Sequence, residues 1–373
     1  MFRERLHKII ISAGHRRFIL SFFVCFLFPF FFSCRNPIMV DLLSPFNKTN
    51  ARIPVINTQP MSNSYDFGES ASSLTVSATV SDGGTLSYQW FKNGAEIPGE
   101  TSDTYVPVTS VLGDCSYHVV VTNTIADNGD RGNKSAAAVS STANINVSLI
   151  SLDGISRYLS SVSHGSVPSD PVSVPAKISL GDTTGSVSVW NDLLGIIDVA
   201  GVYVDLDLSA CSIIGSGFGS SYAGPGGKDR IVSIVLPSGI SSISESAFSN
   251  CTSLVDIKPL NGITSIGQAA FSGCEGLKQF KLPDGVTSIE VDTFSGCSGL
   301  TTVNLSSVSS VGNNAFAACE NLASITIGGG CVITLTIVGD PTRFDLFFIY
   351  YYGSSSQAAG TYTWNAGAWS GPH

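Results

Sequence analysis

One short string returns four times in the second half of this chain at nearly constant spacing. In each copy a phenylalanine is followed three positions later by a cysteine, and the copies begin at Ala247, Ala270, Thr293 and Ala315, with offsets of 23, 23 and 22 residues. Between them lies a second shared string, as in LKQFKLPDGVTSI from Leu277, with apolar residues in the pattern L-x-x-I-x-L. This regularity predicts that every unit folds alike and stacks on its neighbours.

Stacking is required because one unit cannot stabilise itself. We expect Leu277, Phe280 and Leu282 to point inward from a short strand, with the next strand about 4.8 Å away in a parallel sheet. Phe271 and its copies should fill the opposite side of the coil. About five large buried side chains contribute roughly 8 to 15 kcal/mol, whereas ordering ~23 residues costs about 1 to 2 kcal/mol each. The sequence therefore predicts a continuous coil and no independent repeat.

The repeated cysteines, Cys251, Cys274, Cys297 and Cys319, form a column in such a coil. Neighbouring Cβ atoms would lie near the turn spacing of about 4.8 Å with parallel side chains, whereas a disulfide needs about 3.8 Å. No C-x-x-C motif or nearby histidine supplies a metal-ligand pattern. We predict buried free thiols that act as small hydrophobic residues.

The whole unit resembles the BspA-type leucine-rich repeat of bacterial surface proteins, also called the treponemal type, over about residues 231–330 in four copies. The resemblance implies a leucine-rich-repeat solenoid over residues 212–330. An upstream segment, residues 150–211, resembles the α/β cap that precedes such repeats, with LDGISRYLSSV at 152–162, a strand expected at PAKISL and a helix expected at 187–197. We predict a loop at 214–230 and a second cap at 331–373, because the open ends of a coil must be covered. The aromatic run Phe344–Tyr352 either closes that core or forms an exposed adhesive strand.

Strand positions that alternate with the buried ones should form a polar grid on the concave face of the coil. Such a surface suits the recognition of proteins or glycans through many modest contacts, although a solvated sheet would carry similar residues. The candidate binding residues are Ser233, Val235, Asp256, Lys258, Gln279, Lys281, Thr302, Asn304, Ser324 and Thr326.

Residues 52–149 contain short alternating runs, such as LTVSATV and SYHVVVTN, separated by turn sequences. Strands of this length and spacing predict a β-sandwich. The segment also resembles bacterial immunoglobulin-like (Ig-like) domains, which implies that Trp90 fills the space between the sheets. It further implies that the Tyr117 hydroxyl bonds to a loop, while Ala78 and Val119 occupy the usual disulfide positions. The domain would serve either as a spacer or as a second binding surface.

The N-terminus predicts export. Five Lys/Arg residues precede the apolar run Phe18–Phe32, which is too short to span a bilayer as a helix. The sequence FFSC resembles the lipobox of spirochaete lipoproteins, which implies a signal peptide at 1–33, lipidation of Cys34 and a tether at 34–51. Ordinary signal cleavage or an uncleaved anchor are the alternatives.

Charge and motif content exclude several classes of function. The formal net charge is −9, which argues against a nucleic-acid partner. The string GPGGKDR has Asp229 where a phosphate loop needs Ser or Thr. We expect a solvated hairpin turn at DNGD (127–130) rather than a calcium loop. His118, His164 and His373 have no partner at catalytic spacing, so we expect neither an enzyme nor a bound cofactor or metal.

The sequence therefore predicts a mainly β protein, an Ig-like β-sandwich followed by a leucine-rich-repeat solenoid with an α/β N-terminal cap. The resemblance implies an exported lipoprotein, anchored in the membrane on the outer surface of a bacterium. Its implied role is that of an adhesin for host or neighbouring-cell proteins or glycans. The alternative is a structural or assembly protein of the cell envelope with no host ligand.

Overall fold

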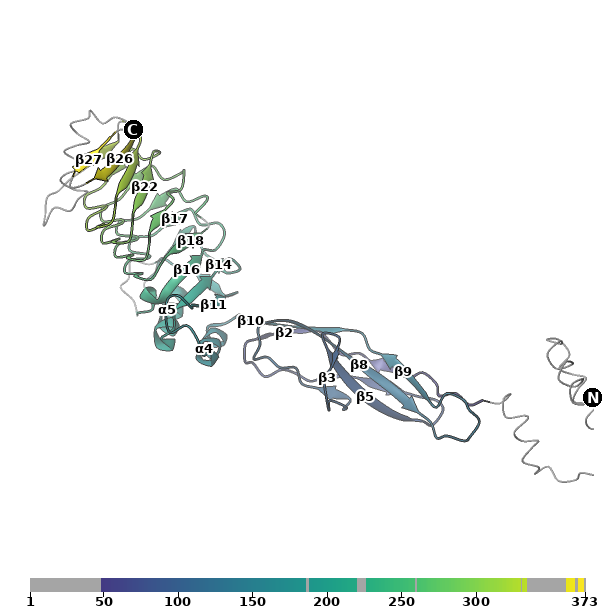
Figure 1. The fold of residues 1–373 in the computed structure, drawn as a ribbon. Coiled ribbons are helices and arrows are strands. Elements are labelled where there is room, and N and C mark those ends of the chain that lie inside the picture. Colours follow the sequence, from purple (N-terminus) through teal and green to yellow (C-terminus); the bar gives the residue numbers. More distant parts are fainter. Residues whose placement is uncertain are drawn as a thin grey trace, which may run out of the picture.

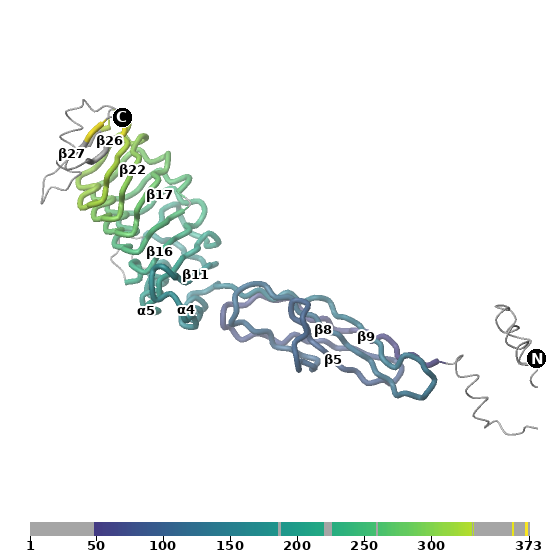
Figure 2. The backbone as a smooth tube through the Cα atoms, viewed as in Figure 1, coloured from purple at the N-terminus to yellow at the C-terminus, as the bar shows by residue number. Residues whose placement is uncertain are grey.

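The computed structural model describes residues 48–185, 188–219, 226–258, 260–329, 331–333, 360–365 and 368–371. This part of the chain is mainly β and contains two α-helices. An elongated unit of strands is joined at one end to a stack of similar turns (Figures 1 and 2). The predicted signal segment 1–33, the lipidation residue Cys34 and the run Phe344–Tyr352 lie outside the described residues, as do most of the tether and most of the C-terminal cap.

The elongated unit is built around one six-stranded sheet. Its central path runs β2-β10-β8-β5-β6, with β9 paired to β8, while β1–β4 and β3–β7 form separate antiparallel pairs. Only β2 and β10 pair in parallel within this unit. The strands are β1 (Val55–Thr58), β2 (Asn63–Asp66), β3 (Leu74–Thr75), β4 (Ser77–Thr79), β5 (Thr85–Lys92), β6 (Ala95–Glu96), β7 (Thr104–Tyr105), β8 (Gly113–Thr124), β9 (Ser135–Val139) and β10 (Ala143–Ser148).

Trp90 and Tyr117 fill the core of this unit. The Trp90 indole is fully buried, and its Nε1 donates a hydrogen bond of 2.9 Å to the Ser102 carbonyl. The predicted hydrogen bond from the Tyr117 hydroxyl to a loop is wrong: the oxygen is buried without such a partner, because the ring packs 5.4 Å from Tyr105. Burial, and then the nearby Cys115 thiol, raises the pKa of Tyr117, so its phenol stays neutral.

A buried carboxylate, that of Asp66, joins the elongated unit to the next segment. It accepts hydrogen bonds from the Ile150 backbone N–H at 3.1 Å, from the Ser151 hydroxyl and from Arg157 Nη2 at 3.2 Å. A Cβ at Gly154 would lie 1.9 Å from Asp66 Oδ1. The close approach therefore requires glycine there, and the hydrogen bonds satisfy a charge that would otherwise be costly to bury.

The segment that follows contains both described α-helices. Each begins at a serine: Ser151 accepts from Gly154 N–H at 3.0 Å and Ser188 accepts from Asn191 N–H at 3.3 Å, as N-caps do. Trp190 of the second helix packs 5.0 Å from the ring of Phe218 and so covers the first turn of the stack. The elements are α4 (Leu152–Ser161), β11 (Val172–Pro175), β12 (Ser179–Gly181), α5 (Val189–Ala200), β13 (Val204–Asp207) and β14 (Ser212–Ile213).

The repeat region contains two rows of short parallel strands. In both rows residues one unit apart pair directly, as Ser233 does with Asp256 and Ser242 with Ser265. The predicted loop at 214–230 is wrong in part, because it contains β15 and the 3₁₀ helix η2 (Lys228–Arg230). The strands are β15 (Gly217–Phe218), β16 (Ile231–Val235), β17 (Ser242–Ile243), β18 (Asp256–Lys258), β19 (Ser265–Ile266), β20 (Gln279–Phe280), β21 (Ser288–Ile289), β22 (Thr302–Leu305), β23 (Ser310–Val311), β24 (Ser324–Ile327), β25 (Val332–Ile333), β26 (Gly360–Asn365) and β27 (Ala368–Ser370).

Phenylalanine rings form one continuous row opposite the strands. Rings of Phe218, Phe248, Phe271, Phe294 and Phe316 are fully buried and stack with successive centroid distances of 5.8, 5.5, 5.5 and 5.4 Å. Each buried ring contributes about 1.5 to 3 kcal/mol through burial, and each ring pair adds about 0.5 to 1.5 kcal/mol. The row joins every unit to the next.

The cysteine column lies beside this row, and its thiols also form hydrogen bonds. Cys274 and Cys297 are free, and each donates from Sγ at 3.1 Å to the carbonyl of a phenylalanine in the preceding unit, Phe248 and Phe271 respectively. Cys319 makes the same bond of 3.1 Å to Phe294. The thiols are therefore more than small hydrophobic residues, because each one ties two units together.

Each repeated turn uses the left-handed backbone region just before the Ala-Phe pair and again just before the cysteine. The first position is occupied by Ala269 and its equivalents, with φ between 52° and 56°. The second is Gly273 and Gly296, both at φ 75°, but Asn250 at φ 62° and Ala318 at φ 53° in other units. Alanine is strained in this region by about 1 to 2 kcal/mol.

Both rows of strands break between the second and third units. β18 is not paired with β20, nor β19 with β21, so the prediction of one continuous parallel sheet is wrong here. The turns behind remain joined, because Phe271 N–H bonds to the Thr293 carbonyl at 2.9 Å and Gly273 N–H to the Ser295 carbonyl at 2.7 Å. The stack is therefore open on its strand side and closed on its turn side.

We predict that Ala318→Gly stabilises the protein. Glycine adopts φ 53° without the Cβ strain of alanine, although it loses more entropy on folding. The free energy of unfolding should rise by about 0.5 to 1 kcal/mol, measured by urea denaturation. The neighbouring substitution Ala317→Gly, outside the left-handed region, is the matched control and should lower that free energy. An equal loss in both variants would contradict the assignment of strain to residue 318.

The thiol column should also resist alkylation. Burial raises the pKa of the Cys297 thiol to about 12 and that of Cys274 well above its ordinary value. At pH 8 roughly a thousandth of the usual thiolate is then present at Cys297. Iodoacetamide should label the half-buried Cys115 first, as peptide mass spectrometry would show, and Cys297 only after urea is added. Fast labelling of Cys297 in the native protein would rule out the buried column.

Candidate functional site

The outward side chains of five strands form one surface, here called the strand face. It consists of the ten predicted grid positions on β16, β18, β20, β22 and β24. Between them, Ile234, Ile257, Phe280, Val303 and Ile325 point inward and are at most 6% exposed. Ser233, Val235, Ser324 and Thr326 are half-buried, whereas the other six, Asp256, Lys258, Gln279, Lys281, Thr302 and Asn304, are exposed.

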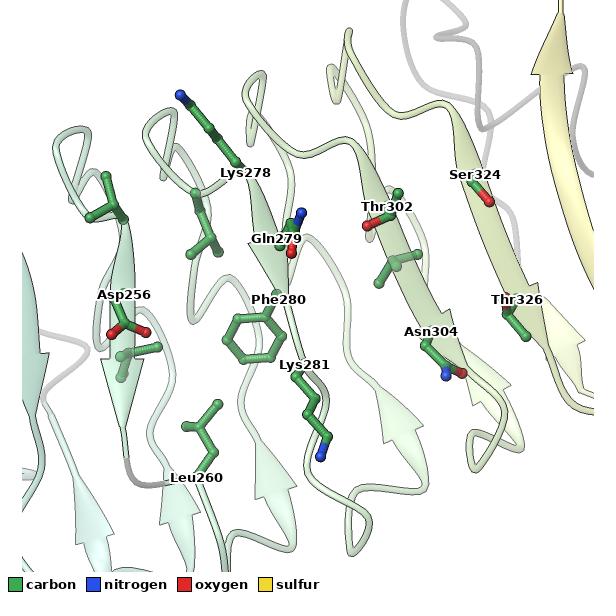
Figure 3. Close-up of a pocket in the computed structure, with 14 residues that line it drawn as sticks. Asp256, Leu260, Lys278, Gln279, Phe280, Lys281, Thr302, Asn304, Ser324 and Thr326 are labelled. Carbon is green, nitrogen blue, oxygen red and sulfur yellow. The ribbon is translucent and has the colours of Figure 1, made fainter.

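A hollow of about 660 Å³ lies on the strand face at the break between β18 and β20 (Figure 3). This volume falls within the usual range of about 300 to 1,000 Å³ for ligand pockets. Apolar side chains, among them Leu260 and Phe280, also contribute to its lining. Seven of the ten predicted positions line the hollow, and they are Asp256, Gln279, Lys281, Thr302, Asn304, Ser324 and Thr326.

The other three predicted positions, Ser233, Val235 and Lys258, do not line the hollow. Ser233 donates a hydrogen bond of 2.6 Å to Asp205. Lys258 Nζ lies 3.0 Å from Asp256 in an exposed ion pair, which contributes little to stability but occupies that lysine. The strand face therefore has two parts. On β16 and β18 its polar side chains bond to neighbouring side chains, whereas from β20 onward they line the hollow.

The order of two residues differs in the second unit, beside the hollow. The first and third units place Leu before Pro at the end of the strand, and both Leu236 and Leu282 are buried. The second unit has the reverse order, Pro259 followed by Leu260, and Leu260 is only half-buried. In the sequence, the second unit therefore has no leucine directly after β18, which ends at Lys258 where the ladder stops.

Two lysines give the hollow a local positive charge. Lys278 and Lys281 are both exposed and line it, and neither forms an ion pair among the described residues. They lie at opposite ends of β20, with Gln279 and Phe280 between them (Figure 3). The amide side chains of Gln279 and Asn304 add donors and acceptors, so the hollow combines an apolar surface with hydrogen-bonding and cationic groups.

Sequence reasoning missed several residues of this surface. Asp205 and Asp207 on β13 continue it, because they pair directly with Ser233 and Val235. The alternation in VDLD at 204–207 was the available signal. Lys278 precedes β20 and so fell outside the alternating pattern. Thr326 contacts Thr361 of β26 through their hydroxyl oxygens at 3.0 Å, a partner 35 residues away that no local pattern could identify.

The other candidate chemical groups have structural roles. In the DNGD turn, Lys134 Nζ contacts Asp130 Oδ1 at 2.6 Å, Asn128 Oδ1 at 2.9 Å and the Thr49 carbonyl at 2.9 Å. Its ammonium thus lies among oxygen atoms of the kind that would ligate a cation. The hydrogen bond from Lys134 to Asp130 is the main cause that lowers the pKa of Asp130. No group of three potential metal ligands occurs among the described residues.

The described histidines and Lys228 of the glycine-rich string make packing or polar contacts. His118 stacks on Phe91 with ring centroids 4.9 Å apart, and the exposed His164 lies 3.8 Å from Asp170. Lys228 donates to the Ser246 carbonyl at 3.1 Å, and burial lowers its pKa. His373 lies outside the described residues. In the described ranges, no helix has the length and apolar character needed to cross a membrane.

Comparisons with known proteins concern the repeats. Residues 227–335 match the family model described as BspA type leucine rich repeat region, in six copies, two more than the sequence strings suggest. Among solved structures, a T. pallidum leucine rich repeat protein is 30% identical (TM-score 0.26) over 30% of this chain and 59% of its own. None of the curated proteins compared with the chain matches it.

Two further solved structures are similar to this chain. A leucine-rich repeat protein from Bacteroides ovatus is 23% identical (TM-score 0.28) over 36% of this chain and 37% of its own. A leucine rich cell surface protein from Faecalibacterium prausnitzii is 22% identical (TM-score 0.28) over 42% of each chain. This chain therefore spans between about two fifths and three fifths of these relatives. Residues 227–335 are therefore similar to BspA-type leucine-rich repeats.

Proposed function

We propose that this chain is a non-enzymatic binding protein of a bacterial cell surface, which captures protein or glycan partners through its strand face. One observation carries the proposal: seven of the ten predicted grid positions surround a single hollow. Their side chains point away from the core, so packing does not account for their polar character. The match to BspA-type repeats supports a binding role by analogy.

We also propose the domain division that the sequence predicts. An Ig-like sandwich at 52–149 is supported by buried Trp90 and by the paired strands β1 to β10. A cap at 150–211 is supported by Trp190, which covers the first ring of the row. A solenoid at 212–330 is supported by the stacked phenylalanines, and a C-terminal cap at 331–373 by β26, which pairs antiparallel with β24. In this division the Ig-like domain is a spacer.

A lipid anchor at Cys34 would place this division on a membrane. The proposal rests on the FFSC sequence after the apolar run Phe18–Phe32, because acyl chains contribute about 0.8 kcal/mol per buried CH₂. Residues 34–51 would then hold the Ig-like domain away from the lipid, and that domain would carry the strand face further out.

Surface display can be tested by protease treatment of intact cells. An adhesin should be removed by trypsin added outside, because exposed basic residues such as Lys278 and Lys281 are cleavage sites. Immunoblotting with an antibody to the repeats measures the loss, and an internal marker protein checks that cells stay intact. Full protection in intact cells, followed by cleavage after lysis, would favour the envelope assembly role instead.

Binding through the strand face can be tested with Thr302→Trp. Thr302 is exposed and lines the hollow, and a large ring there should obstruct any partner. Capture of immobilised matrix proteins or arrayed glycans by beads coated with the full chain should fall at least roughly tenfold. Thr287→Trp, at an exposed position beside the other row of strands, is the matched control. Equal capture by both variants would exclude the strand face as the binding surface.

A further inference from the structure

The hollow is bounded by two strand edges that lack their usual partner. At the start of the strands, Val255 N–H bonds to the Val232 carbonyl at 2.8 Å and Thr301 N–H bonds to the Lys278 carbonyl at 3.0 Å. The equivalent bond from Lys278 N–H to the Val255 carbonyl does not occur among the described residues. Neither do the pairings expected between β18 and β20. Backbone N–H and C=O groups of β18 and β20 therefore border the hollow without pairing with each other.

Extended peptides complement such edges. Unpaired strand edges bind a peptide through its main chain, while pockets select alternate side chains. Gln279 and Asn304, on adjacent strands of the lining, offer the Gln279 amide and the Asn304 Nδ2 donor to the main chain of such a peptide, while Asn304 Oδ1 already accepts from Ser306 N–H at 2.9 Å. A glycan has no regular series of N–H and C=O groups to match these edges, so the backbone favours a peptide.

The lysines specify which side chains the peptide carries. Lys278 and Lys281 are three residues apart, about 10 Å along an extended strand, and their side chains lie at opposite ends of β20. In an extended peptide, residues i, i+2 and i+4 share one face, and i to i+4 spans about 13 Å. A central apolar residue could then enter the hollow toward Leu260 and Phe280, while acidic residues on each side meet the two lysines.

We propose that the hollow binds an extended peptide segment in which two acidic residues flank one apolar residue at alternate positions. The inference rests on the proposed binding role of the strand face and names the ligand class. The chain as a whole is acidic, with a formal charge of −9. The two unpaired lysines are therefore a local attraction for carboxylates and set the orientation of the peptide.

Binding can be measured directly with a defined probe. The probe is a fluorescein-labelled peptide Thr-Glu-Thr-Leu-Thr-Glu-Thr, titrated with the purified full chain and followed by fluorescence anisotropy. A second peptide with both glutamates replaced by lysine reports charge selectivity, and a hyaluronate oligosaccharide tests the glycan alternative. The acidic peptide should bind and the other two should not. Binding of hyaluronate in its place, or equal binding of both peptides, would overturn the proposal.

Charge reversal in the protein gives the decisive comparison. The double variant Lys278→Glu/Lys281→Glu should weaken acidic-peptide binding at least roughly tenfold and gain binding of the lysine peptide. Lys48→Glu, an exposed lysine near the elongated unit, is the matched control and should change nothing. Unchanged affinity in the double variant, or a loss without the gain for the lysine peptide, would overturn the proposal.

Restoring the common residue order tests the strand break itself. The swap Pro259→Leu/Leu260→Pro recreates the Leu-Pro order of the neighbouring units and should close the hollow. Peptide binding should fall at least roughly tenfold while thermal stability stays equal or rises; unchanged binding with the fold intact would overturn the proposal.

If Thr302→Trp abolishes capture of partners but no peptide binds the native chain, only the ligand class is wrong. If Thr302→Trp has no effect, the binding role of the strand face fails.

Discussion

Stacked phenylalanine rings hold the repeat region together, and the rest of its structure depends on them. The rings repeat at 5.4 to 5.8 Å from Phe218 to Phe316 without interruption. Thiol hydrogen bonds from Cys274 and Cys297 reinforce the same side. Because these contacts pass through the point where both rows of strands break, the coil remains one body there. Cohesion therefore lies on the turn side, and the strand side is free to open.

Because contacts on the turn side hold the units together, a hollow can form on the strand side of this regular fold. A parallel sheet normally pairs every backbone group with its neighbour, which leaves no cavity between strands. Here the sequence has Pro259-Leu260 in place of the Leu-Pro order of the two neighbouring units. Phe280 packs 4.9 Å from Phe271 in the second unit and 5.0 Å from Phe294 in its own unit. The hollow thus coincides with a local departure from the repeat pattern.

The sequence predicts the regular features well and the irregular ones poorly. The inward positions and the alternating grid follow from a period of 22 or 23 residues, which is a local signal. The left-handed conformation of Ala318 could not be predicted because alanine seldom adopts it. The contact between Asp66 and Arg157 joins residues 91 positions apart, and no periodic pattern encodes such a pair. The hollow required knowledge of how two neighbouring units fail to pair.

The strand break also lowers the stability of the repeat region. Each ladder hydrogen bond absent at the break forgoes about 0.5 to 1.5 kcal/mol, and the half-buried Leu260 gains less from burial than the buried Leu236 and Leu282. Two neighbouring units show that the Leu-Pro order fits this fold, since Leu236 and Leu282 are both buried. Among the described residues, this stabilisation is absent beside Lys278 and Lys281, which form no ion pair there, and this coincidence supports the proposed binding role. Regular packing elsewhere in the stack supplies the stability that makes such an opening tolerable.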